Sequence, residues 1–397
     1  MNAVHTRLGG MDGALAAMVR WVWTVVIVVC CCLAAGGCAL NPRQLHTDRL
    51  DTTNRRADPT PCATAAPTGA TAVADIFAAA DPRVFAGGDG ILATRLSDGR
   101  TLVITADNFA DASGGLVQPT IGPGTYMRHN AAFLVVGGCL YSAAAGELLP
   151  TTYSGPTNAL EFFWPTALFE TSATTFTLFA DIMTTPSPTT FNNFEFSRLG
   201  VARYSIRVVG ATVSAVREPD LPVDATGITW GAGGGLDQAG RALIYGSRPG
   251  SIAWDIFAAR TLDPLSNPAT WEYATGKGWR IGAMPTAIAT NCSDAVGPLS
   301  GDPYLFATKL GRAIGTDVAL FTLNPDTGRI TSTEVVAQAP TTDEVWAYNP
   351  QFYPISDQKA ALLINHNSVS PNQHERSAYS PSAIADVGMA EPHPVTP

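Results

Sequence analysis

The chain has 397 residues, a formal net charge of −9 and a charged fraction of only 14%. Glycine (37 residues) and proline (29 residues) are numerous, which predicts a turn-rich, all-β protein rather than a mainly helical one. An acidic chain without basic runs also argues against a nucleic-acid partner.

The N-terminus predicts an export signal. Arg7 and Arg20 precede an apolar run over residues 21–35, which has the length of a signal-peptide core and is short for a membrane span. Residues 1–37 are therefore expected to form the signal.

Cys38 follows two glycines, and small residues directly before a cysteine resemble the bacterial lipoprotein cleavage site. Ala35 stands where that motif usually has Leu. We expect Cys38 to be lipid-modified and to anchor the protein at the outer face of the cytoplasmic membrane. A simple signal peptide or an uncleaved anchor helix would still export the domain.

Residues 38–72 are rich in Thr, Ala, Pro and Asp and poor in large apolar residues, so they are expected to be a disordered tether. Of the cysteines beyond Cys38, Cys139 and Cys292 are expected to pair, because Cys62 lies in this tether. None has the C-x-x-C spacing of a zinc site.

Short β-type runs separated by turn residues follow, over residues 73–367, and residues 368–397 are expected to be a C-terminal tail. The runs are 101–105, 132–136, 176–180, 204–209, 242–245, 304–307, 318–321 and 361–364. Helical periodicity is absent over any useful length. This pattern fits a sandwich, a large barrel or a propeller, and it does not choose among them.

The first two runs lie between Asp89 and Asp107. A three-residue loop at 98–100 would pair Thr94 with Ile104 and make the two aspartates diagonal neighbours on one face, roughly 7–8 Å apart. A two-residue loop would put them on opposite faces. Paired carboxylates at the end of a hairpin are what glycoside hydrolysis requires.

Several short motifs, in order, resemble a family of bacterial five-bladed β-propellers. The motifs are GGDG at 87–90, LSDGRTL at 96–102, DNF at 107–109, MRHNA at 127–131, FWP at 163–165, ITWG at 228–231, AAR at 258–260, PATW at 268–271, GKGW at 276–279 and AYNPQF at 347–352. This family of formerly uncharacterised domains includes endo-D-arabinanases, and the similarity covers about residues 75–367. Thr105-Ala106-Asp107-Asn108 departs from the aromatic-Gly-Asp-Thr more usual there.

The resemblance implies a five-bladed β-propeller with Asp89 and Asp107 as the catalytic pair. Arg128 and Asn130 would bond sugar hydroxyls or order a blade entrance. The aromatic residues that match positions lining the propeller mouth are Trp164, Trp230, Trp279, Trp346 and Tyr348. The aspartates and the tryptophans each also have a purely structural interpretation. Aspartates in turns bond their own backbone, and most tryptophans of β proteins lie in the core. His366 is expected to be structural.

The sequence thus predicts an exported glycoside hydrolase that cleaves arabinofuranosyl linkages of cell-wall arabinan. The alternatives are a non-catalytic glycan-binding propeller and a protein-interaction scaffold. No cofactor or metal is expected, the predicted partner is a cell-wall polysaccharide, and a monomer is expected.

Overall fold

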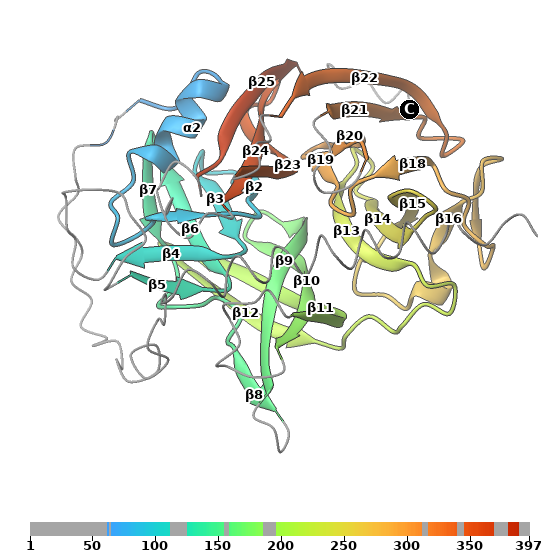
Figure 1. Ribbon diagram of the computed structural model, residues 1–397, viewed down its shortest axis with the longest axis horizontal. Helices are drawn as coiled ribbons and strands as arrows, with labels where there is room; N and C mark the ends of the chain where they lie inside the picture. Colours follow the sequence, from blue (N-terminus) through green and yellow to red (C-terminus); the bar gives the residue numbers. More distant parts are fainter. Residues whose placement is uncertain are drawn as a thin grey trace, which may run out of the picture. The chain divides into compact units, whose positions relative to one another are not determined.

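Antiparallel sheets joined by tight turns make up almost all of the described part of the chain. The computed structural model describes residue 62 and residues 65–111, 125–154, 159–185, 196–311, 317–339, 345–368 and 380–388. The sheets form the blades of a five-bladed β-propeller (Figure 1), so the expected fold is confirmed. The predicted signal, Cys38 and most of the tether lie outside the described residues.

Blade 1 is a four-stranded sheet with a small sheet at one end. Its strands are β2 (Leu92–Arg95), β3 (Thr101–Thr105), β6 (Ala131–Val136) and β7 (Cys139–Ser142). The small sheet is made of β1 (Gly87–Gly88), β4 (Asn108–Asp111) and β5 (Thr125–Arg128). The small sheet lies at the open end of the β2–β3 hairpin, where β1 precedes β2 and β4 follows β3.

Blade 2 has the longest strands. They are β8 (Thr152–Ser154), β9 (Ala159–Ser172), β10 (Thr175–Thr185), β11 (Ser197–Val209) and β12 (Thr212–Glu218). Apolar residues alternate along β10 and β11, so each strand presents one face to blade 1 and the other to blade 3.

Blade 3 carries additional strands at its outer edge. It comprises β13 (Thr229–Leu236), β14 (Ala242–Pro249), β15 (Trp254–Thr261), the 3₁₀ turn η2 (Pro268–Thr270), β16 (Glu272–Ala274), β17 (Trp279–Ile281) and β18 (Ala289–Cys292).

Blades 4 and 5 complete the ring. Blade 4 comprises β19 (Gly297–Leu299), β20 (Asp302–Lys309), β21 (Asp317–Leu323) and β22 (Ile330–Gln338). Blade 5 comprises β23 (Val345–Ser356), β24 (Lys359–Ser368) and β25 (Ser382–Gly388).

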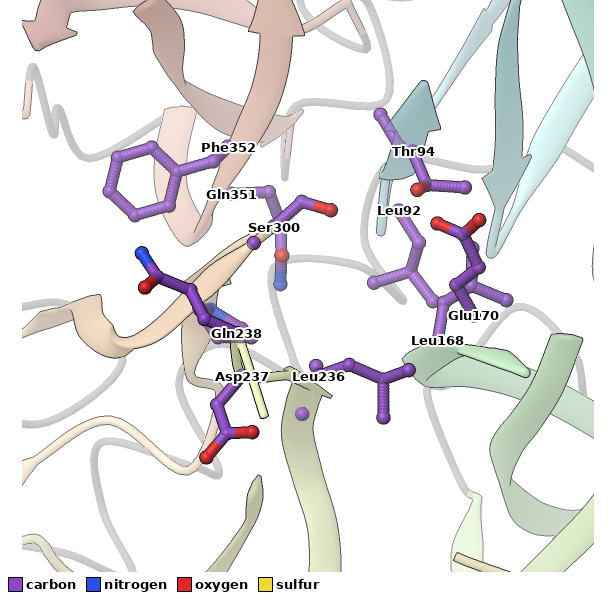
Figure 2. Close-up of a pocket in the computed structure, with 15 residues that line it drawn as sticks. Leu92, Thr94, Leu168, Glu170, Leu236, Asp237, Gln238, Ser300, Gln351 and Phe352 are labelled. Carbon is purple, nitrogen blue, oxygen red and sulfur yellow. The ribbon is translucent and has the colours of Figure 1, made fainter. Parts of the chain in front are cut away.

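Five strands surround the central axis, one from each blade. In ring order β2, β9, β13, β19 and β23 contact one another. They enclose a cavity of about 370 Å³ to which all five strands contribute (Figure 2). The hairpins that leave these strands lie at the same end of the ring as this cavity, because every axial strand runs in the same direction.

Apolar side chains fill each of the five gaps between blades. The blade 1–2 gap, for example, buries Leu102, Ile104 and Leu178, and the blade 2–3 gap buries Phe169 and Phe257. The gap between blades 5 and 1 also contains helix α2 (Ala70–Ala78), which is described below.

Helix α2 was not predicted, because nine residues give too short a window for a helical period. One side of the helix is buried, and Val73, Ile76 and Phe77 lie on that side. The helix begins at Ala70, before the expected domain start at residue 73. The expected tail at 368–397 also contains β25, which pairs with β24 and supplies the third strand of blade 5. Both expected domain bounds are therefore corrected.

The disulfide joins Cys62 to Cys139, and Cys292 is a buried free thiol. The expected Cys139–Cys292 pair is wrong. Cys139 begins β7 in blade 1, whereas Cys292 ends β18 in blade 3, and the chain preceding α2 returns to blade 1 and brings Cys62 to it. Among the described helices none has the length and apolar character needed to cross a membrane.

Candidate active site

Asp89 and Asp107 lie directly opposite each other across the first hairpin. Leu92 pairs with Ile104 in one ladder and Gly88 with Asn108 in the next, and the strands are interrupted between them, at residues 89–91 and 106–107. The Asp89 N–H donates to the Asp107 carbonyl, and the Ala106 N–H donates to the Asp89 carbonyl, both at 2.9 Å. The aspartates are thus close neighbours, and the charge of Asp107 acts on Asp89.

The expected register, Thr94 with Ile104, is wrong by two residues. The Leu96 N–H donates to the Arg100 carbonyl at 2.7 Å, so the three-residue loop is 97–99 rather than 98–100. Gly99 has φ of 86° and therefore takes the last loop position, which requires a left-handed residue. The shift brings Asp89 beside Asp107 instead of placing it diagonally across the ladder.

The glycines around Asp89 are required by close backbone approach. A Cβ on Gly88 would lie 2.7 Å from the Asp107 carbonyl oxygen. Gly90 has φ of 60°, and a Cβ there would lie 2.5 Å from that of Ala106. The GGDG motif is therefore the sequence that lets the hairpin carry two opposed carboxylates at this point.

Asp89 is buried, with a relative exposure of 8%. Burial, and next the charge of Asp107, raise the pKa of Asp89 from 3.8 to about 8, while a hydrogen bond from Tyr348 opposes the shift. The Tyr348 hydroxyl donates to Oδ2 of Asp89. Asp89 is therefore protonated at neutral pH.

Asp107 has a more open and more polar environment, with 22% of its side chain exposed. Oδ1 accepts a hydrogen bond from the indole N–H of Trp164 at 2.9 Å, and Nδ1 of His129 lies 3.3 Å from the same oxygen. Both contacts fix the orientation of the carboxyl group. The two aspartates therefore differ in environment as an acid and a base or nucleophile must.

Phe162 and Trp164, on one face of β9, pack around Asp107 and His129. The His129 ring stacks on Phe162 with centroids 4.0 Å apart, and Trp164 packs edge-on against Phe162 at 5.5 Å. Trp164 is at the site as expected. His129 was missed by the sequence analysis, although it lies inside the MRHNA motif between the two residues that were chosen.

A bulge in β23 aims Tyr348 at Asp89. Tyr348 pairs with Asn365 and Gln351 with Leu363, so β23 has one extra residue here. Asn349, in the bulge, has φ of 49°. Its carbonyl accepts from Asn365 Nδ2 and its Oδ1 from Gln351 Nε2, both at 2.8 Å. Tyr348 therefore lies beside Asp89, and its contact with substrate stays a prediction.

Arg128 and Asn130 have different places. Arg128 pairs with Asn108 in the β4–β5 ladder, next to Asp107. Asn130 is fully buried, and its amide bonds the carbonyls of Leu149 and Phe163 and the N–H of Leu149. Asn130 orders a blade entrance, and the expectation that it binds substrate is wrong.

Trp230 is a core residue. It is 4% exposed, packs against Trp271, and its indole N–H donates to Asp224 at 2.6 Å. The expectation that it contacts substrate is wrong, because the inner face of blade 3 at this level is the blade 2–3 core rather than the mouth.

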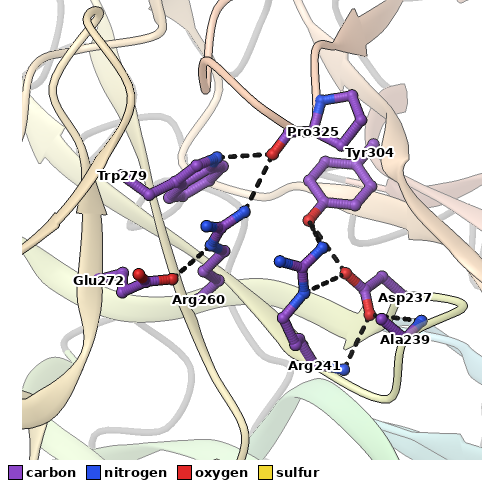
Figure 3. Close-up of polar contacts among 8 residues, drawn as sticks. All are labelled: Asp237, Ala239, Arg241, Arg260, Glu272, Trp279, Tyr304 and Pro325. Atoms are coloured by element: carbon purple, nitrogen blue, oxygen red, sulfur yellow. Dashed lines mark hydrogen bonds and ion pairs between the residues drawn. The ribbon is translucent and has the colours of Figure 1, made fainter.

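Trp279 lies on β17, near the outer edge of blade 3. Its indole N–H donates to the Pro325 carbonyl at 2.7 Å, and Arg260 stacks on its ring at 4.7 Å (Figure 3). The expectation that it lines the mouth is wrong, because it joins blade 3 to a blade 4 turn. The Trp346 side chain lies outside the described residues.

Other titratable groups have clearer structural roles. His366 is buried beside Lys309, and both burial and the Lys309 charge lower the pKa of His366.

Asp181, which the sequence analysis did not select, pairs with Trp164 in the β9–β10 ladder and forms an ion pair with Arg198 at 3.0 Å. Burial raises the pKa of Asp181 to about 6. Among the described residues no cluster of three or more His, Cys, Asp or Glu could hold a metal ion.

Comparisons with known proteins place the chain in a family and a fold. A family model described as "Domain of unknown function (DUF5005)" matches residues 80–389. No curated protein matches. A solved structure of a suggested hydrolase from Bacteroides ovatus ATCC 8483 has a TM-score of 0.58 at 16% identity, over 79% of this chain and 88% of that one.

A second solved structure is Zg3597, a family 117 glycoside hydrolase produced by Zobellia galactanivorans. It has a TM-score of 0.45 at 10% identity, over 77% of this chain and 84% of that one. At these identities the likeness concerns the fold alone.

Proposed function

This chain belongs to the DUF5005 family of domains of unknown function, and on the geometry of its site we propose that it is a glycoside hydrolase. The observation that carries the proposal is the opposed pair Asp89 and Asp107 in contrasting environments. A buried carboxyl that keeps its proton beside a second, more exposed carboxyl is the arrangement that glycosidic bond cleavage needs.

In the proposed reaction Asp89 is the general acid. Its proton passes to the glycosidic oxygen as the bond from that oxygen to the anomeric carbon breaks. Tyr348 fixes the orientation of Asp89 through Oδ2. Burial keeps the proton on Asp89 at neutral pH.

Asp107 attacks the anomeric carbon from the other side. Trp164 and His129 both contact Oδ1, which orients the carboxylate, and no described residue bonds Oδ2. A nucleophilic Asp107 corresponds to the retaining mechanism, in which the two carboxyl groups lie about 5–5.5 Å apart. The ionised Asp89 then deprotonates a water that releases the sugar from Asp107, so net retention is expected.

We propose arabinofuranosyl linkages of cell-wall arabinan as the substrate. The support is the sequence resemblance to the propeller family that includes endo-D-arabinanases. Trp164, at the site beside Asp107, offers a flat ring to the apolar face of a sugar.

We further propose that the enzyme acts outside the cytoplasm, anchored through Cys38 and acting as a monomer. The Cys62–Cys139 disulfide supports this location, because such bonds persist in oxidising compartments. A Cys38→Ala variant should move from the membrane fraction to the soluble exported fraction.

The test is incubation of the purified domain with arabinogalactan, mannan and agar, with products separated by chromatography. Release of arabinose oligosaccharides from arabinogalactan alone supports the full proposal, and release from another glycan supports a glycosidase of different specificity. Asp89→Asn and Asp107→Asn should each lower the rate by about 10³-fold or more, and Asp98→Asn, in the same hairpin, should not. If the unmodified protein bound a glycan but released no oligosaccharide from it, the protein would be a glycan-binding propeller rather than a hydrolase.

A further inference from the structure

The channel at the axis of the propeller has a second end, away from the aspartate pair. Asp89, Trp164 and Tyr348 precede or begin the axial segments of β2, β9 and β23. The cavity is lined farther along the same strands, by Thr94, Glu170 and Phe352. The nearest lining residues, Leu92 and Gln351, follow Asp89 and Tyr348 by three positions, roughly 10 Å at about 3.3 Å per residue.

None of the residues that contact Asp89 or Asp107 lines this cavity. Its other walls come from the hairpins at that end, including Gln238 of the β13–β14 turn and Ser300 of the β19–β20 turn. The cavity therefore lies farther along the axis than the aspartate pair.

The lining combines apolar walls with neutral hydrogen-bonding groups. Leu92, Leu168, Leu236 and Phe352 supply apolar surface, and the neutral polar side chains are Thr94, Gln238, Ser300 and Gln351 (Figure 2). Gln351 uses Nε2 on Asn349, which leaves its Oε1 to accept from a ligand. Hydroxyls, amides and aliphatic carbons together are the groups that bind a sugar ring.

The charges of the lining exclude an anionic ligand. No Lys or Arg is among the described lining residues, and the two charged groups are Glu170 and Asp237. The Asp237 carboxylate is already bonded by Arg241 at 2.9 Å and by Tyr304 at 3.0 Å (Figure 3). Glu170 is the remaining carboxyl, and burial raises its pKa.

We propose that this end of the channel is a second, non-catalytic binding site for a neutral sugar of monosaccharide size. The volume of about 370 Å³ is near the lower limit for ligand pockets, which sets that size. The proposal goes beyond the hydrolase function and does not depend on it.

Saturation-transfer NMR with neutral D-arabinose, D-galactose and D-mannose, anionic galacturonate and cationic glucosamine tests the site. At least one neutral sugar should bind in the millimolar range, and galacturonate should not. Binding should persist in Asp89→Asn, which leaves the channel end intact.

Two variants place the bound sugar. Gly235→Leu should abolish binding by filling the cavity, because a Cβ there meets only Pro303 at 3.5 Å and φ is not left-handed. Gln238→Ala, at an exposed turn position, should weaken binding about twofold to tenfold without affecting folding. The proposal would be overturned if binding were lost in Asp89→Asn but kept in both channel variants. It would also be overturned if only glucosamine or galacturonate bound, or if no sugar bound.

Discussion

At the residue scale, the site depends on two identical side chains held in unlike surroundings. Asp89 is buried between Tyr348 and the charge of Asp107, whereas Asp107 is more exposed and accepts from Trp164. The raised pKa of Asp89 therefore arises from its burial and from the charge of Asp107, and the Tyr348 hydrogen bond limits it.

Tyr348→Phe should move the basic limb of the pH profile of kcat/KM to higher pH. The Tyr348 hydroxyl bonds and favours the ionised Asp89, so its loss raises the pKa of the acid further and keeps it protonated longer. The profile is measured on whichever glycan the purified enzyme cleaves. Tyr141→Phe, an exposed position on β7, is the control and should leave the profile unchanged. A shift of the limb to lower pH would contradict the assignment of Asp89 as the acid.

Asp89→Asn should stabilise the protein more at pH 9 than at pH 5. The folded protein keeps a proton on Asp89 that the unfolded chain, with a pKa of 3.8, has released, so wild-type stability falls as pH rises from about 4 to about 8. Asparagine removes this dependence. Thermal unfolding at several pH values measures it.

The matched control for this prediction is Asp98→Asn. Asp98 is exposed, and its hydrogen bonds with Arg100 lower its pKa, so it stays ionised throughout this range. Its difference from wild type should be the same at pH 5 and pH 9. An equally flat difference for Asp89→Asn would contradict the raised pKa.

At the element scale, irregular positions in two strands create the site. The left-handed Gly99 sets the register that opposes the aspartates, and the bulge at Asn349 turns Tyr348 towards them. In both cases a single backbone conformation decides where a functional side chain lies.

Asn349→Ala should be less stable than Asn349→Gly by about 1 kcal/mol. Both variants lose the amide that bonds Gln351, but only alanine brings a Cβ to the left-handed φ of 49°. Urea unfolding of the pair measures the difference. Equal stabilities would mean that the backbone at 349 relaxes without strain.

At the scale of the whole molecule, the ring closes without a strand shared between its first and last blades. Helix α2 packs on β24 and β25 of blade 5 and contacts β7 of blade 1 (Figure 1). Asp386 of β25 accepts from the N–H of Ala70 at 2.7 Å, and Cys62 is bonded to Cys139 of β7. The chain before the first blade is therefore the closure between blades 5 and 1.

Cys62→Ser should lower the free energy of unfolding by about 2–4 kcal/mol, because the bond constrains a long loop of the unfolded chain, with 77 residues between its ends. Thermal unfolding with and without a reducing agent measures the effect. Reduction should lower the Tm of the wild type and leave that of Cys62→Ser unchanged. An unchanged wild-type Tm would show that α2 closes the ring without the disulfide.

The sequence by itself determined the all-β character, because alternation and turn residues are local signals. All eight predicted runs, from 101–105 to 361–364, lie within strands. It placed Asp89 and Asp107 on the two arms of one hairpin, but it left open whether they share a face, because one residue more or less in the loop decides that. The five-bladed propeller was predicted from the family resemblance, because the spacing of the strands did not distinguish it from a sandwich or a barrel.

The tertiary structure alone decided which residues surround that pair. Tyr348 reaches Asp89 across 259 positions of the sequence, and Asp107 is approached by His129 from the β5–β6 turn and by Trp164 from β9. Trp230 and Trp279, selected through the same resemblance as Trp164, are instead a core residue and an outer-edge residue. The physical reason is that contacts between blades depend on how the ring closes, and no local pattern of side chains contains that information.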